Sequence, residues 1–444
     1  MLAGRCAAHR DNGAGRLPLP CRALSAITAT TLPTGLPLYR ISVEGTRALT
    51  ILVAFDAGAR TERPEENGMA HFLEHLVFKG GETYPTYRDV NAAAERIGAV
   101  LNAYTSHDLV AFHITVRAER ALEAADLLTD FVARPQIAPD ELERERGVVV
   151  QEIARAADQP AVLAEQLIDE AAFGEHPLGR PVLGPAQHIR ERFTREGILA
   201  FRSRRWAPGA AAALMVGNLD FVPGNGDGAV GNLFERLPPA AEPDSFEPAP
   251  ESRHRVLVQE RDSNQSHLRM SDRPALDVSD ARQRAALVIF STLLGGSMGS
   301  RLFDEIREQR GLAYSVHAAG HAHADVSVLQ LSAGLESSKC IEAYRRMHEI
   351  VSELREHGPS EEEVDRARAF AAGARAIAFE NTGAVARHAA QQAVVFRESV
   401  DPDATIARLD AVTMRDVQEV AQSVDDSLSV ACVGPHTTAE LEAA

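Results

Sequence analysis

The chain has 444 residues, of which 46 are Lys or Arg and 63 are Asp or Glu, and its formal net charge is −17. This length suffices for about two to four domains with substantial cores, and 45% apolar with 25% charged residues is typical of folded rather than disordered proteins. The acidic balance argues against a nucleic-acid-binding protein, which needs a basic surface.

The sequence also disfavours membrane and secreted classes. Its longest apolar stretch, residues 48–59, is interrupted by Asp56 and Gly58 and is too short to cross a bilayer. Four cysteines without CxxC spacing are too few for a disulfide framework, so we expect reduced thiols in a bacterial cytoplasm. Residues 1–30 are arginine-rich without an apolar signal core; we interpret them as a disordered or mis-assigned N-terminal tail, with organelle targeting as the minor alternative.

Strand and helix patterns alternate from Thr31 onward. Pro139-Asp140 is expected to start a long helix, because an Asp carboxylate at the N-cap can accept hydrogen bonds from the first backbone amides. Alternation of this kind predicts an α+β or α/β fold. The predicted elements are strands over residues 48–55 and 104–116 and helices over 66–79, 87–97, 117–133 and 139–157.

Residues 222–252 are rich in glycine and proline, which is typical of a linker. The chain beyond them repeats a similar order of elements, which suggests a structural duplication. We place the first domain at 31–235, the linker at 236–255 and the second domain at 256–440. The elements predicted in the second half are strands over 256–260 and 329–335 and helices over 279–295, 300–310, 338–356 and 360–379.

The most informative segment is residues 69–76, Met-Ala-His-Phe-Leu-Glu-His-Leu, which contains the HxxEH motif, the inverted form of the zinc-peptidase helix motif. On a helix, His71 and His75 share one face and can direct two imidazoles at one ion. Glu74 lies beside that face and can reach a water molecule there without being a ligand. The motif therefore predicts a catalytic zinc site.

A catalytic zinc site of this type needs a third protein ligand. Glu145 and Glu152 are seven residues apart, so they lie on one helix face with Val148 and Val149 between them. A carboxylate on a buried face needs a partner, and a metal ion is a suitable one. The glutamates available in this helix are Glu141, Glu143, Glu145 and Glu152.

These motifs resemble the pitrilysin/insulinase family of zinc metallopeptidases, in the short branch that includes the mitochondrial processing peptidase beta subunit and its bacterial relatives. In that family the third ligand follows the second histidine by 77 positions, which here gives Glu152. A further family glutamate, seven residues earlier, corresponds to Glu145 and orients a ligand imidazole. The resemblance covers about residues 31–435 and extends to segments 78–80, 101–106, 176–179, 217–220, 295–303 and 306–314.

The resemblance implies two homologous α/β-sandwich halves, each with a mixed, mostly antiparallel sheet flanked by helices, of which only the first binds metal. It implies that substrate adds as a strand beside Asn102 and Ala103. It also implies that Arg307 and Tyr314, seven residues apart, bind substrate carbonyls. Because short family members pair, we expect a homodimer, or a heterodimer with a related subunit, in which these two residues serve the partner's zinc site.

We therefore expect a zinc endopeptidase acting on peptides or unfolded polypeptide segments, without nucleic-acid or membrane partners. One Zn²⁺ per chain would be held by His71, His75 and Glu152, with Glu74 as the catalytic base. Two alternatives stay open: a catalytically silent or structural subunit of a hetero-oligomeric peptidase, and a protease dedicated to one precursor peptide. The sequence does not define a cleavage preference.

Two further groups of histidines are expected to be structural. His317, His321 and His323 are interpreted as solvated strand and loop residues rather than as a second metal site. His107 and His113, predicted to share one strand face, are expected to pack or to form edge hydrogen bonds.

Overall fold

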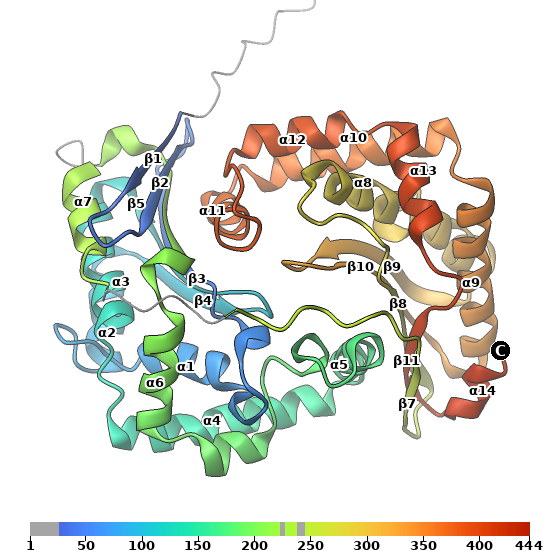
Figure 1. The fold of residues 1–444 in the computed structure, drawn as a ribbon, viewed down its shortest axis with the longest axis horizontal. Helices are drawn as coiled ribbons and strands as arrows, with labels where there is room; N and C mark the ends of the chain where they lie inside the picture. The colour runs from blue at the N-terminus through green and yellow to red at the C-terminus, as the bar shows by residue number, and fades with distance from the viewer. Residues whose placement is uncertain (1–25, 223–226, 238–244) are drawn as a thin grey trace, which may run out of the picture.

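The computed structural model describes residues 26–222, 227–237 and 245–444, and for residues 227–229 it describes the backbone only. Two halves lie side by side, the N-terminal half in blue and green and the C-terminal half in yellow to red (Figure 1). The predicted tail, 1–30, falls largely outside the described residues. The prediction of a disordered tail is wrong for residues 27–30, because a strand begins at Ile27 and pairs with the next strand.

Among the described residues, the N-terminal half contains a six-stranded sheet in the order β1-β2-β6-β3-β5-β4. Only β2 and β6 pair in parallel, so this sheet is mixed and mostly antiparallel. Strand β4 lies at one edge and has one free side. The strands are β1 (Ile27–Thr31), β2 (Pro37–Ser42), β3 (Ala48–Phe55), β4 (Val100–Thr105), β5 (Val110–Arg117) and β6 (Ala211–Gly217).

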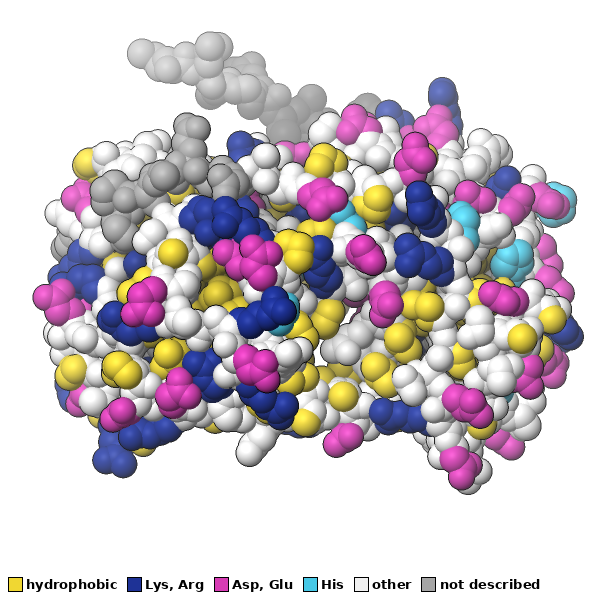
Figure 2. Space-filling model, turned by 60° about the horizontal axis from the view of Figure 1, so that its bottom comes forward, with side chains coloured by type: hydrophobic (Ala, Val, Ile, Leu, Met, Phe, Trp, Pro, Cys, Tyr) yellow, Lys and Arg dark blue, Asp and Glu magenta, His cyan; other side chains and the backbone are white. Residues whose placement is uncertain are grey.

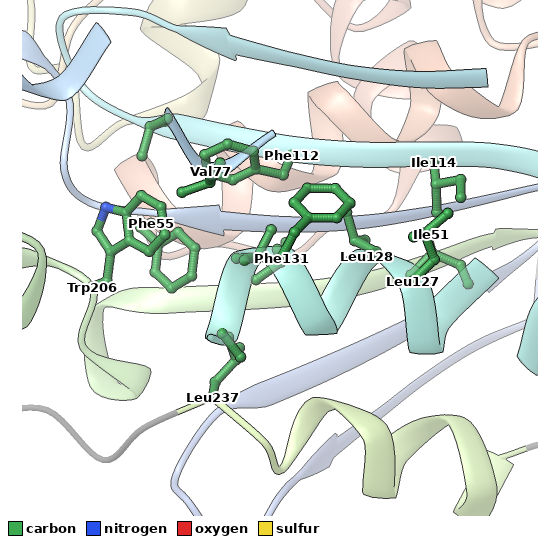
Figure 3. Packing of buried hydrophobic residues seen from close by; sticks show 14 of the residues in the cluster. Ile51, Phe55, Val77, Phe112, Ile114, Leu127, Leu128, Phe131, Trp206 and Leu237 are labelled. Carbon is green, nitrogen blue, oxygen red and sulfur yellow. The ribbon is translucent and has the colours of Figure 1, made fainter. Parts of the chain in front are cut away.

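Helices cover one face of this sheet and enclose the main core. Aromatic side chains dominate one end of it: Phe55 stacks on Trp206 with ring centroids 4.7 Å apart, and Phe112 and Phe131 pack nearby (Figure 3). Burial of such large rings supplies much of the hydrophobic stabilisation. The helices of this half are α1 (Met69–Val77), α2 (Tyr87–Ile97), α3 (Ala121–Ala133), α4 (Pro139–Asp158), α5 (Pro160–Phe173), α6 (Arg195–Arg205) and α7 (Asp227–Phe234).

The C-terminal half has a second sheet, of five described strands, in the order β7-β11-β8-β10-β9. Here too only one pair, β7 with β11, is parallel. The predicted fold class, two α/β halves with mostly antiparallel sheets, is confirmed. The elements are β7 (Val256–Glu260), β8 (Gln265–Asp272), β9 (Ala313–Ala322), β10 (Ser327–Glu336), β11 (Ser429–Gly434), α8 (Ala281–Ser291), α9 (Cys340–His357), α10 (Glu361–Ala378), α11 (Thr382–Gln391), α12 (Pro402–Asp410), α13 (Met414–Ser423) and α14 (Thr438–Glu442).

The two halves exchange one helix each. Helix α5 of the first half packs on β11 and β8 of the second, while α11 of the second half packs on β3 and β6 of the first (Figure 1). Small residues of α11, such as Ala386 and Ala389, allow close approach to Leu52 and Leu214 of the sheet. Because β3 is covered on both faces, its sequence is apolar almost throughout rather than alternating.

A buried polar junction also joins the halves. The Asp108 carboxylate accepts hydrogen bonds from Arg60 (3.2 Å), from His323 Nδ1 (2.8 Å) and from the backbone N–H of Ala324 (3.2 Å). Burial alone would raise the pKa of Asp108, but the bonds and charges of His323 and Arg60 outweigh it and hold that pKa below its usual value. His323 is therefore a half-buried structural residue, which corrects its prediction as a solvated one.

Three local predictions are wrong in whole or in part. The single strand predicted over 104–116 is the hairpin of β4 and β5, because Ser106 Oγ and the Leu109 backbone bond across a tight turn. The helix predicted to start at Pro139-Asp140 does so, but Asp140 is not its cap: the N-cap is Ala138, without a side-chain hydrogen bond, and Pro139 takes the first helical position. The segment 222–252, linker-like by composition, includes helix α7, which ends before the linker placed at 236–255. The helix predicted over 300–310 is present, mostly as the π-helix Phe303–Gln309.

The face of the molecule drawn in Figure 2 shows no large field of one charge. Acidic and basic side chains are interspersed over the face in Figure 2, with apolar side chains exposed near its middle. Among the described residues, we find no helix that combines the length and the apolar character needed to cross a membrane.

Helix α1, which carries the HxxEH motif, has an unusual start. Its N-cap residue, Gly68, has φ = 97° and no side chain to accept the first amides. The buried Glu62 replaces that cap: its carboxylate accepts from the backbone N–H of Gly68 (2.9 Å) and Ala70 (2.7 Å) and from Asn67 Nδ2 (3.2 Å). A carboxylate at this end of a helix is also favoured by the helix dipole.

We expect Glu62→Ala to lower the free energy of unfolding by about 3 kcal/mol or more, because three donors lose their acceptor and each unpaired donor costs about 1–3 kcal/mol. Chemical denaturation would measure the change. Glu65→Ala is the matched control, since Glu65 is an exposed acid near the same turn. Equal stability of the two variants would contradict this role of Glu62.

Helix α5 contains a carboxyl group without a described partner. Asp169 is half-buried near the β11 contact, and no hydrogen bond or ion pair reaches it from the described residues. Burial, with a smaller contribution from Glu165, raises the pKa of Asp169 to about 8. The folded state therefore binds this proton more tightly than the unfolded state, so the contribution to stability is complete below about pH 4 and is lost as the pH rises toward 8.

Asp169→Asn should consequently raise the free energy of unfolding at pH 8 by about 1–2 kcal/mol and change it little at pH 4.5, because the amide cannot ionise. Denaturation curves at both pH values test this. Glu170→Gln, at an exposed position of the same helix, should show no such pH dependence. A gain for Asp169→Asn that is equal at both pH values would refute the titration.

Candidate metal centre

Two histidines of α1 point to one side of the helix. His71 and His75 are one turn apart, and their ring centroids are separated by 4.6 Å. Their side chains are 10% and 23% exposed. Burial, and to a smaller extent the neighbouring His75, lower the pKa of His71 to about 4, so this imidazole is neutral near pH 7.

Helix α4 brings a carboxylate to the two rings. Glu152 Oε2 lies 3.4 Å from His75 Nε2 and 3.8 Å from His71 Nε2. One potential ligand atom from each of the three residues lies within 4.8 Å of the others. The structure thus brings together the three residues that the sequence predicts as metal ligands.

This arrangement fits a metal ion. The atoms that converge are His71 Nε2, His75 Nε2 and Glu152 Oε2, and each of them can offer a lone pair to a cation. Tetrahedral zinc with ligand bonds of about 2.0–2.2 Å separates its ligand atoms by roughly 3.4 Å, close to the spacing found here. Two imidazoles and one carboxylate are also the donor set of catalytic zinc sites, which keep one position open.

The orientation of His75 is fixed from behind by Glu145. The two side chains share a hydrogen bond of 2.8 Å between His75 Nδ1 and Glu145 Oε1, and the other oxygen of Glu145 lies 2.5 Å from Lys79 Nζ. With Nδ1 donating to Glu145, the lone pair of His75 Nε2 faces Glu152. The contacts with His75 and Lys79 outweigh burial and keep the pKa of Glu145 below its usual value. Burial would lower the pKa of His75, but the nearby glutamates, above all Glu145, raise it.

Glu74 is the remaining acid of the motif. Thr105, at the end of β4, donates its hydroxyl hydrogen to Glu74 Oε2 at 2.5 Å. Among the described side chains, none is hydrogen-bonded to the other oxygen, which is left for water. Burial raises the pKa of Glu74, so its carboxylate is a stronger base than an exposed one.

Strand β4 carries the predicted substrate residues. Asn102 is exposed, and its Oδ1 accepts a hydrogen bond from the Ala103 backbone N–H at 2.9 Å. Side chains of Leu101 and Ala103 face the main core, whereas Tyr104 contacts the cluster around α11. The free edge of β4 runs toward Thr105 and thus toward Glu74.

Arg307 and Tyr314 lie in the C-terminal half, away from the three ligands in the sequence and in the fold. Arg307 stacks over Phe303 and lies 3.6 Å from Glu308, and Tyr314 is 54% exposed. Within the described residues, no hydrogen bond or ion pair joins either of them to His71, His75 or Glu152.

Three supporting residues were missed from the sequence: Glu62, Lys79 and Thr105. Lys79 stands one turn after His75, and this spacing could have indicated a shared partner. No local pattern connects Thr105 to Glu74. The prediction that Val148 helps to bury the Glu145–Glu152 face is wrong, because Val148 is 50% exposed and only Val149 is buried.

The remaining histidines and cysteines make other contacts. Near Asp108, the rings of His107 and His321 each pack edge-on against His323. The prediction that His107 shares a strand face with His113 is wrong, because His107 lies in the hairpin turn between β4 and β5. Cys340, Cys432 and His436 also lie within 4.8 Å, but both cysteines are free thiols and His436 Nε2 is hydrogen-bonded to Ser266 Oγ.

Comparison with known proteins agrees with this geometry. A zinc protease of Streptomyces coelicolor is 30% identical over 93% of this chain and 90% of its own length, and the zinc protease YmxG of Bacillus subtilis is 27% identical over 88% and 93%. A protease from Helicobacter pylori has the same fold, with a TM-score of 0.84 and 21% identity over 93% of this chain and 100% of that one. A Pseudomonas fluorescens structure, described as a peptidase M16 inactive domain, also has a TM-score of 0.84, with 18% identity over 93% and 98%.

Two family models together match most of the chain. The model of insulinase, peptidase family M16, matches residues 41–186, and the model of the peptidase M16 inactive domain matches residues 192–370. The first match contains the HxxEH helix and Glu152, and the second runs from just before α6 in the first half into α10 of the second. On these matches the protein belongs to the insulinase family, peptidase family M16.

Proposed function

We propose that this M16 metallopeptidase is a zinc-dependent endopeptidase that cleaves peptides or unfolded polypeptide segments. The observation that carries the proposal is the convergence of His71, His75 and Glu152 beside the buried base Glu74. The donor set favours one zinc ion per chain. Zinc bound there would polarise a peptide carbonyl and make water acidic enough to attack at neutral pH.

The proton transfers fall to Glu74. Its free oxygen would accept a proton from the attacking water and deliver that proton to the amine that leaves. Thr105 holds the other oxygen and thereby fixes the direction of the carboxylate. Glu145 would keep His75 oriented throughout, because it bonds the ring nitrogen that faces away from the ligands.

Substrate would bind as an extra strand along β4. An edge strand offers backbone groups that any extended peptide can pair with, so affinity would depend little on sequence. The Ala103 backbone N–H now donates to Asn102 Oδ1. The Asn102 side chain would have to rotate away before this N–H could donate to a substrate carbonyl. Binding in mid-peptide, rather than at a chain end, is the basis for an endopeptidase.

A dimer would complete the site and enclose it in a chamber. The support for this is that Arg307 and Tyr314 are largely exposed and lie in the half that lacks the ligands. We propose that each chain presents these residues to the candidate centre of its partner, in a homodimer or with a related subunit. There they would donate hydrogen bonds to carbonyl groups near the scissile bond.

Glu74→Gln should abolish peptide hydrolysis, with a loss of at least about 10²-fold, because the amide cannot accept the proton. The zinc content of the purified protein should stay at about one ion per chain, since Glu74 is not a ligand in this assignment. Mass spectrometry of a peptide library and metal analysis measure both. A chelator should abolish wild-type activity and added zinc should restore it, whereas full activity of Glu74→Gln would exclude this base.

Mixing a His71→Ala chain with a Tyr314→Phe chain tests the shared site. If Tyr314 acts on the partner's centre, half of the randomly mixed dimers gain one intact site, so activity should return to about one quarter of the wild-type value. Native mass spectrometry would verify that mixed dimers form. Mixed dimers that are no more active than either parent would show that Tyr314 does not act across the interface.

A further inference from the structure

One face of the edge strand looks toward the C-terminal half. Along β4, Tyr104 contacts the hydrophobic cluster around α11, and His113 lies on the same face of the neighbouring strand, directly opposite Asn102. Opposed residues on adjacent strands point to the same side of a sheet. Every second side chain of a peptide added to β4 would therefore also point toward α10 and α11.

A cavity of about 390 Å³ lies on that side. Tyr104 and Ser106 line it from the hairpin, and Arg375 of α10 and Arg387 of α11 line it from the other half. This volume can hold an amino-acid side chain, and the cavity is open to solvent. The walls thus combine the continuation of the proposed substrate strand with two guanidinium groups.

Neither arginine has an acidic partner. Among the described residues, no carboxylate forms an ion pair or hydrogen bond with Arg375 or Arg387, and Arg375 contacts only the Phe379 ring as a cation, at 5.6 Å. The one acid in the cavity wall, Asp108, already receives Arg60, His323 and the Ala324 amide. Burial alone lowers the pKa of Arg375, which is the mark of a cation desolvated without compensation.

The histidines nearby do not change this balance. Burial, with the charge of Arg387, lowers the pKa of His113 to about 4, and burial with three arginines does the same for His388, so both are neutral near pH 7. The adjoining cavity provides a contrast. There Arg284 and Arg408 also face each other, but they share the Glu398 carboxylate at 2.7 and 3.6 Å. Glu398 thus pairs with both of those arginines, whereas neither Arg387 nor Arg375, which lines both cavities, has such a partner among the described residues.

We propose that Arg375 and Arg387 form a binding subsite for a carboxylate of the peptide substrate, so that the enzyme prefers substrates with an acidic residue on the α11-facing side of the added strand. A guanidinium pairs with carboxylates through charge-assisted hydrogen bonds. The carboxylate belongs to an Asp or Glu side chain or to the C-terminus of the peptide. This inference rests on the proposed function, since it assumes that substrate binds along β4.

The test measures binding in the Glu74→Gln background, in which peptides are not consumed. Short fluorescein-labelled peptides, amidated at the C-terminus and neutral except for one Glu, are compared with matched Gln peptides by fluorescence anisotropy. The Glu peptide should bind roughly tenfold more tightly when Glu occupies one of the alternate positions that face α11, and not at the positions between them. A second arm compares free-acid with amidated neutral peptides, which identifies a terminal carboxylate as the ligand.

Arg387→Glu should abolish or invert the preference for Glu over Gln. Arg387 is exposed, so this change is not expected to unfold the protein. Arg408→Gln is the matched control, because it removes the same charge from the adjoining cavity, where Glu398 already pairs with it. The control should keep the preference unchanged.

The subsite would be overturned if Glu and Gln peptides, and free-acid and amidated peptides, all bound with equal affinity. It would also be overturned if the preference for Glu persisted in Arg387→Glu, or if none of the peptides bound. Hydrolysis of the neutral Gln peptides by the Glu74 enzyme is followed separately. Turnover without a charge preference would refute the subsite and leave the peptidase proposal intact. A charge preference in binding without any turnover would refute the peptidase proposal and support the subsite.

Discussion

The candidate centre depends on how α1 is held against α4. Glu145 makes this contact, because one of its oxygens is bonded to His75 Nδ1 and the other lies 2.5 Å from Lys79, two residues after α1 ends. This double contact fixes both the rotation of α1 and the direction of the His75 lone pair. Glu62 holds the other end of α1 by capping its first amides. A two-turn helix would otherwise have little stability of its own, so buried carboxylates at both ends set the geometry that the ligands need.

The same stretch of chain also connects the site to the second half. Helix α4 ends at Asp158, less than two turns after Glu152, and α5 begins at Pro160 and packs on the C-terminal sheet. The third ligand therefore sits close to the helix that the two halves exchange. In return, α11 supports the sheet whose edge strand leads to Glu74. Neither half can shift far without moving part of the centre, which gives the half without the ligand triad a structural reason to be present.

The sequence predicted the ligands well because their chemistry is local. His71, Glu74 and His75 lie within two helical turns, and a long amphipathic helix fixed which face Glu152 shares with Glu145. It failed where structure depends on distant contacts. The hairpin at Ser106–Leu109 interrupts a segment that has strand character throughout, and Val148 is exposed although its neighbour Val149 is buried. Glu62 could not be assigned, since its role as a cap depends on a loop that places it beside Gly68, six residues away.

Side-chain preference is the property that the sequence could least define, and the fold explains why. Strand pairing along β4 uses hydrogen bonds to backbone groups, which all peptides share. Selectivity must therefore come from the residues that contact the side chains on the two faces of the added strand. One face meets the Glu74 helix and the apolar core. The other meets α10 and α11, whose Arg375 and Arg387 stand more than 270 positions after Asn102 in the chain. Arg375 and Arg387 carry no recognisable motif, and only the helix exchange places them beside Tyr104. Selectivity in this architecture is thus a product of the packing between halves, and it can change without altering any ligand of the candidate metal.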